Sequence, residues 1–219
     1  MKKKTLALLL SLVLIIGVVT GGTLAWLTDT TDQVVNTFTV GNIDIALTET
    51  DADNDDNANA NAYKMIPGWD NPKDPYATVT ADSEDCYLFV ELTETIGNFS
   101  YTPSGSQTPV KATFGAYLSY TVDTGADKWI ELDAVKYPGV YYKVIEDAEK
   151  GDTNKHYVLA GNKVTTNATV TKEMMDALEA AGANANPKLS ITAYACQYWK
   201  TNGVEFGAEN AWKTIKGIS

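Results

Sequence analysis

Apolar and polar residues alternate with a period of two along most of this chain. In the stretch 42–50, Ile43, Ile45 and Leu47 alternate with more polar positions, and the stretch 86–95 repeats the pattern. Such alternation predicts β-strands with one buried and one wetter face, because successive side chains of a strand point to opposite sides of a sheet. Further strand-like stretches are 76–82, 114–122, 129–135, 140–147, 156–161, 164–171 and 188–199.

The stretch 86–95 also predicts which side chains lie inside. Its odd and even positions form two sets, and the more uniformly apolar set is expected to face the core. The set predicted to be buried is Cys86, Leu88, Val90 and Leu92, and the set predicted on the wetter face is Tyr87, Phe89, Glu91 and Thr93.

Turn-forming residues separate these stretches. Pro67-Gly68, Pro138-Gly139 and Gly161-Asn162 are pairs that favour turns. Many short strands joined by such turns are typical of all-β sandwiches and jelly rolls. The sequence therefore predicts a mainly β fold, a jelly-roll-like antiparallel β-sandwich with one or two short helices.

Two stretches predict these helices. Thr171 is a favourable N-cap for the stretch 172–182, in which Gly182 is the stop signal, and the stretch 207–217 predicts a short terminal helix. We expect both to be packing elements. The side chains predicted to face inward are Met174, Met175 and Leu178 in the first, and Ala211, Trp212 and Ile215 in the second.

Residues 1–25 have the three parts of a secretory signal peptide. Lysines occupy positions 2 to 4, the stretch 6–19 is mostly apolar, and Thr23-Leu24-Ala25 offers small residues for cleavage. We expect cleavage between Ala25 and Trp26, which leaves residues 26–219 as a single domain. Counted on to Leu27, the apolar stretch just reaches the ~20 residues that span a bilayer, so an uncleaved anchor is the alternative.

Charge excludes one class of partner. The chain has a formal net charge of −11, and removal of a segment with three lysines and no acidic residue makes it −14. A strongly negative surface repels nucleic acid at long range, so no nucleic-acid partner is expected.

The chain offers little for catalysis. His156 is its one histidine, which excludes a histidine-based zinc protease motif, and we expect it to be an ordinary strand residue. Cys86 and Cys196 lie far apart in the sequence, each in a predicted strand. They could form a disulfide or remain two buried free thiols. The sequence predicts no enzyme and no cofactor.

The acidic loop 50–62 is the one place that suggests a metal. Asp51, Asp53 and Asp55 follow the odd-numbered spacing of a calcium loop. The match then fails, because Asp56 replaces the required glycine and Ala62 replaces the bidentate glutamate. Weak calcium binding by this loop and a solvated loop without a metal both remain as hypotheses.

Two blocks of the sequence follow a recognisable order of motifs. The first is G-G-T-x-A, an aromatic or apolar pair, x-D, then N-x-F-x-x-G and an alternating strand, and its residues are Gly21, Gly22, Thr23, Ala25, Trp26, Leu27, Asp29, Asn36, Phe38 and Gly41. Pro67-Gly68 and the strand 85–92 come next, and the closing T-A-Y-A-x-Q and A-W elements contain Ala193, Ala195, Gln197 and Trp212. In these motifs and their order the chain resembles the TasA/camelysin family of Gram-positive bacteria.

The resemblance implies an exported jelly-roll protein whose signal peptide is cut by a SipW-type peptidase. It also implies secretion to the extracellular matrix or cell surface of a Gram-positive bacterium, self-association into biofilm matrix fibres, and contacts with other matrix or cell-wall components. In such fibres the N-terminal strand of one subunit completes the sheet of the next. The residues expected to form this assembly strand are Val34, Asn36, Phe38 and Val40.

The leading hypothesis is therefore a structural protein that assembles through the strand 32–40, although that strand could instead pair within its own domain. One alternative is a camelysin-like surface metalloprotease. Another is a surface adhesin or carbohydrate-binding module that uses exposed aromatic rings. The rings considered for it are Trp69, Trp129, Tyr141, Tyr142 and Trp199.

Overall fold

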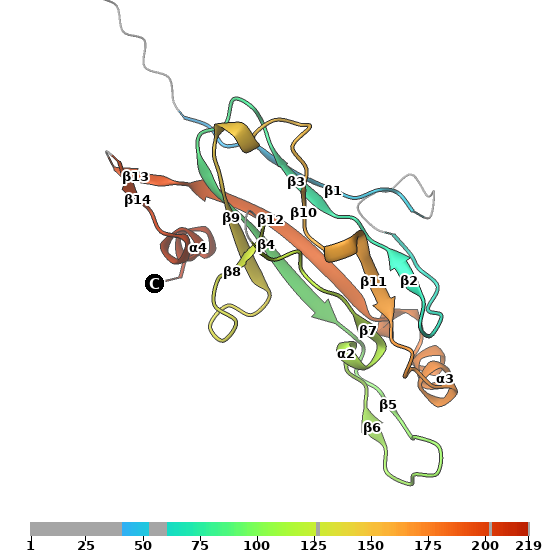
Figure 1. Cartoon of the computed structure of the whole chain (residues 1–219). Coiled ribbons are helices and arrows are strands. Elements are labelled where there is room, and N and C mark those ends of the chain that lie inside the picture. Colours follow the sequence, from blue (N-terminus) through green and yellow to red (C-terminus); the bar gives the residue numbers. More distant parts are fainter. Residues whose placement is uncertain (1–40, 53–60, 126–127, 202, 219) are drawn as a thin grey trace, which may run out of the picture. The chain divides into compact units, whose positions relative to one another are not determined.

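The largest sheet is antiparallel and has the strand order β12-β4-β9-β8 (Figure 1). The computed structural model describes residues 41–52, 61–125, 128–201 and 203–218. Strand β4 (Cys86–Thr95) pairs along its whole length with β12 (Lys188–Gln197), and on its other side with β9 (Val140–Ile145). Strand β8 (Ile130–Glu131) pairs with β9. Among the described strands, β12 and β8 are therefore the edges of this sheet.

A three-stranded antiparallel sheet packs against one face of the four-stranded sheet. Its order is β1 (Ile45–Thr48), β3 (Tyr76–Val79), β10 (His156–Tyr157). The main apolar core lies between the two sheets, with Ala77 and Val79 of β3 packed together with the inward residues of β4. The alternation of Ile43, Ile45 and Leu47 is confirmed, because all three pack against this core.

The opposite face of the four-stranded sheet is covered by α4 (Ala208–Lys216), as Figure 1 shows. Trp212 of this helix lies with its ring centroid 5.4 Å from that of Phe89 and 5.4 Å from that of Tyr194. Tyr87 and Phe89 are buried here, so the prediction of a wetter face for them is wrong. The reason is that a helix more than a hundred residues later in the chain covers this face.

A third sheet has the order β2 (Asp70–Pro72), β11 (Lys163–Thr166), β7 (Leu118–Ser119). Beside it, α3 (Lys172–Ala181) begins at Thr171, whose side chain accepts a hydrogen bond from the Met174 amide at 3.4 Å, and ends at Gly182 as expected. The remaining elements are β5 (Ser100–Tyr101), β6 (Val110–Lys111), α2 (Phe114–Tyr117), β13 (Trp199–Thr201), β14 (Val204–Glu205) and the 3₁₀ turns η1 (Asp147–Glu149), η2 (Ala160–Asn162) and η3 (Ala183–Ala185).

The mainly β fold with several antiparallel sheets is confirmed, and both predicted helices form. The described residues contain a third short helix, α2, inside the stretch predicted as the strand 114–122. Phe114 and Tyr117 lie one helical turn apart and are both buried there, so a single turn places both rings inside. No helix in the described ranges is long and apolar enough to cross a membrane.

One predicted strand is much shorter than expected. The stretch 129–135 forms only β8, because the Asp133 side chain accepts hydrogen bonds from the amides of Val135 (3.0 Å) and Lys136 (2.9 Å). An aspartate that binds the backbone two and three residues later stabilises a turn and ends the strand.

Candidate functional site

The outer edge of β12 is the longest unpaired strand edge in the described part of the chain. β12 has ten residues, all paired with β4, and no strand among the described residues pairs with its other side. Such an edge presents a row of backbone donors and acceptors that a further strand can bind. The residues form a strand because Leu189, Ile191 and Ala193 alternate with exposed polar positions and pack against the main core.

A groove of about 980 Å³ lies beside the first half of this edge. Its walls include parts of β1, β2, β7, β11, α3 and β12, and it lies beside both the main core and the smaller core under α3. We call it the β12 groove. The apolar residues that line it are Leu47, Ala62, Met65, Pro75, Leu118, Val164, Met175, Leu178, Ala183, Pro187, Leu189 and Ile191.

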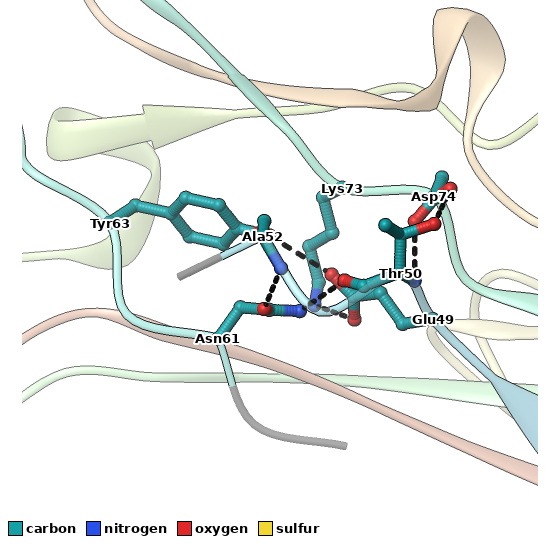
Figure 2. A network of polar contacts seen from close by, with 7 residues as sticks. All are labelled: Glu49, Thr50, Ala52, Asn61, Tyr63, Lys73 and Asp74. Atoms are coloured by element: carbon teal, nitrogen blue, oxygen red, sulfur yellow. Dashed lines mark hydrogen bonds and ion pairs between the residues drawn. The ribbon is translucent and has the colours of Figure 1, made fainter. Parts of the chain in front are cut away.

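One wall of the β12 groove is a polar network, drawn in Figure 2. The Lys73 ammonium lies 2.8 Å from Glu49 Oε2, and the two side chains are only 15% and 10% exposed. The Tyr63 hydroxyl donates to Glu49 Oε1 at 3.1 Å. Both oxygens of this carboxylate are therefore occupied, as a largely desolvated charge requires.

The same network holds both ends of the acidic loop 50–62 (Figure 2). Asp74 accepts hydrogen bonds from the Thr50 amide at 2.9 Å and from the Thr50 hydroxyl at 2.7 Å. Asn61 accepts from the Ala52 amide at 2.6 Å and donates to the Thr50 carbonyl at 3.0 Å. The loop therefore begins and ends beside the groove.

Several residues predicted for function lie outside the described residues. These are Ala25 and Trp26 at the expected cleavage site, Val34, Asn36, Phe38 and Val40 of the expected assembly strand, and Asp53 and Asp55 of the calcium hypothesis. Asp51 is described, and the described residues contain no group of three or more metal-ligating side chains. Calcium binding stays a prediction.

The aromatic residues considered for glycan binding have different environments. Trp129 is 1% exposed and its Nε1–H donates to the Tyr157 carbonyl at 2.7 Å, so its ring belongs to the core. Trp69 and Trp199 are 59% and 44% exposed. They come from separate elements, β13 in the case of Trp199 and the turn before β2 in the case of Trp69.

The two cysteines are free thiols. Cys86 pairs with Gln197 across the β4–β12 register, while Cys196 pairs with Tyr87, so the two side chains point to opposite faces of the sheet. Burial raises the pKa of Cys86 to about 12, which leaves its thiol protonated and unreactive at neutral pH.

His156 is a buried strand residue, as expected, and is held in its neutral form. Its Nδ1 lies 3.4 Å from the Lys143 ammonium and its Nε2 lies 3.0 Å from the Glu149 carbonyl. Because an ammonium only donates, Nδ1 accepts and Nε2–H donates. Burial, together with the nearby Lys143 charge, lowers the pKa of His156.

This environment predicts a loss of stability in mild acid. The unfolded chain protonates His156 below about pH 6.5, whereas the folded protein resists protonation. The free energy of unfolding should therefore fall as pH drops from 6.5 towards 5, and urea unfolding at several pH values measures it. His156→Gln should flatten the curve in this window. An unchanged pH dependence in the variant would assign the effect to other groups.

Comparison of the chain with protein-family models, curated proteins and solved structures finds no match. A functional argument therefore depends on the geometry of the β12 groove and on the sequence. The groove was not predicted, because its walls come from elements far apart in the sequence, including β1, β11, α3 and β12, and no local pattern connects them.

Proposed function

We propose that this protein is an exported structural subunit of a surface or matrix fibre. In this proposal the strand 32–40 of one copy pairs with the outer edge of β12 in the next copy, and its side chains enter the β12 groove. The observation that carries the proposal is the ten-residue edge of β12, which no described strand pairs with, and the groove beside it, which is lined by apolar and polar side chains. An added strand gains backbone hydrogen bonds from such an edge and specificity from pockets for alternate side chains.

The chemistry of the expected assembly strand supports this pairing. Val34, Asn36, Phe38 and Val40 lie two residues apart, so in the expected strand their side chains would share one face. Three of the four are apolar, which suits the leucine, valine and methionine side chains of the groove. The amide of Asn36 suits a groove that also has a polar wall at Glu49 and Lys73.

The packing of two sheets across the main core supports the finer fold hypothesis. We take these sheets to form the two layers of a jelly-roll-like sandwich, in which the incoming strand extends the layer that contains β12.

The test is a chain that begins at Gly41. It should remain rich in β-structure by circular dichroism but form no fibres in electron micrographs, whereas the form that begins at Trp26 should form them. A peptide of residues 31–40 should raise the melting temperature of the shortened chain as the peptide concentration increases, because it binds only the folded state. A shortened chain that still forms fibres would exclude strand donation. A shortened chain that is unfolded would show that the strand pairs within its own domain.

A further inference from the structure

Strand β12 has different surroundings at its two ends. Its start, at Lys188, lines the β12 groove beside α3. Its other end leads into the hairpin formed by β13 and β14, and Figure 1 shows this hairpin and α3 at opposite ends of the strand. Ten residues of strand extend about 33 Å. A surface at one end of β12 therefore cannot meet a surface at the other end within the same copy.

The described chain begins beside the β13–β14 hairpin. The Glu84 amide donates a hydrogen bond to the Asn42 carbonyl at 2.9 Å. The Tyr198 amide donates to the carbonyl of Asp85, the next residue, also at 2.9 Å. These two neighbouring residues hold the first described residues and the start of the hairpin side by side. The expected assembly strand, which ends one residue before Gly41, is therefore attached to the chain next to the hairpin.

The β13–β14 hairpin presents two exposed apolar side chains, Trp199 and Val204. The Trp199 ring packs edge-on against the Tyr198 ring, with 4.7 Å between their centroids. The Phe206 amide closes the hairpin by donating to the Tyr198 carbonyl at 2.7 Å. Exposed apolar side chains that gather on one element are typical of contact surfaces, and tryptophan is enriched among the residues that dominate them.

A turn with exposed apolar side chains also borders the β12 groove. Residues 66–69 lie between chain segments that line the groove on both sides, and we call this turn the groove rim. Its exposed side chains are Ile66 and Trp69. The Trp69 amide donates to the Ile66 carbonyl at 2.9 Å, and the Trp69 carbonyl accepts from the Thr166 amide at 2.9 Å. The rim is therefore fixed on β11.

Strand length decides how two copies meet if the strand 32–40 of one copy binds β12 of the next. Nine residues extend about 30 Å, close to the length of β12, so residue 40 of the donor copy would lie at one end of the acceptor strand. Beyond Gln197, the acceptor's own residues 41 and 42 already lie against Glu84. An antiparallel donor strand avoids that end. It brings residue 40, and the donor's hairpin with it, to the acceptor's groove rim.

We propose that Trp199 and Val204 of one copy pack on Ile66 and Trp69 of the next copy, as a second contact of the fibre interface. Eight large hydrophobic side chains are exposed among the described residues, and these four are half of them. The two surfaces differ, so the contact is head-to-tail, the kind from which open fibres are built. This inference rests on the proposed function, because the donated strand brings the two copies together.

The experiment measures the critical concentration for fibre growth of the secreted form that begins at Trp26. Trp199→Ala should raise it about tenfold or more, the effect of truncating a tryptophan at the centre of an interface. Val204→Ala should raise it by a smaller factor. The matched control is Val135→Ala, the same substitution at an exposed valine between β8 and β9, which should leave the critical concentration unchanged.

A double variant tests whether the two tryptophans touch across the interface. Trp199→Ala and Trp69→Ala together should raise the critical concentration little more than either change alone, because each removes the same contact. Effects that multiply in the double variant would overturn the proposed contact. Monomers of all these variants should melt near the temperature of the unaltered monomer, since the replaced side chains are exposed.

Peptide binding separates this inference from the proposed function. Below the critical concentration, a peptide of residues 31–40 should bind the Trp199→Ala monomer as tightly as the unaltered monomer, because the β12 groove is intact. Weaker peptide binding would show that Trp199 acts through the groove and would overturn the second contact. An unchanged critical concentration of Trp199→Ala would overturn it as well and leave strand donation standing. Absence of fibres from the unaltered form would overturn both.

Discussion

Trp212→Ala should destabilise the protein more than any other single change in α4. Trp212 is 2% exposed, and its ring packs on Phe89 and Tyr194. Truncation of a buried tryptophan costs about 3–5 kcal/mol, because the lost contacts and the cavity add together. The substitution also removes a contact of Lys216. Its ammonium lies 4.9 Å from the Trp212 ring and 2.7 Å from Glu91, so it would lose the ring and keep the carboxylate.

Urea unfolding followed by circular dichroism measures this effect. The matched control is Trp69→Ala, which removes the same side chain at a position that is 59% exposed and should change the free energy of unfolding by less than about 1 kcal/mol. A Trp212→Ala variant as stable as the control would mean that α4 contributes little to the cooperative fold.

The local sequence was sufficient to predict features that depend only on residues of the same element. Thr171 and Gly182 correctly delimit α3, because capping depends on hydrogen bonds within a few residues. Ile43, Ile45 and Leu47 correctly indicate the buried face of β1 and the residues before it, because period two follows from strand geometry alone.

Local sequence failed where a distant element determines the environment. Tyr87 and Phe89 are aromatic residues opposite an apolar face, and only the later helix α4 decides that they are buried. Phe114 and Tyr117 fit both a strand and one helical turn, and burial of both rings selects the turn.

The β12 groove shows the same limit. Leu189 and Ile191 were predicted to lie on a strand, but whether that strand is at an edge depends on the order of all four strands in the sheet. The other walls of the groove come from elements far away in sequence, which only the fold brings to this edge.

Leu189→Lys should abolish fibre growth if the β12 groove accepts a strand. Leu189 lines the groove and is partly buried, so a lysine places a charge where the apolar side chains of the incoming strand must lie. The expected result is loss of fibres in electron micrographs. The matched control is Thr192→Lys on the same strand, since Thr192 is exposed, does not line the groove and points to the other face of the sheet. Near-equal melting temperatures of the two variants would exclude unfolding as the cause.

A mixing experiment makes the same prediction sharper. The Leu189→Lys variant keeps the donor strand and lacks a usable groove, whereas the chain that begins at Gly41 keeps the groove and lacks the strand. Neither should polymerise alone, and together they should form a one-to-one dimer and nothing longer, because each has only one working half of the interface. Light scattering coupled to size exclusion measures the product. Fibres from the Leu189→Lys variant alone, or equal inhibition by Thr192→Lys, would place the assembly interface elsewhere on the molecule.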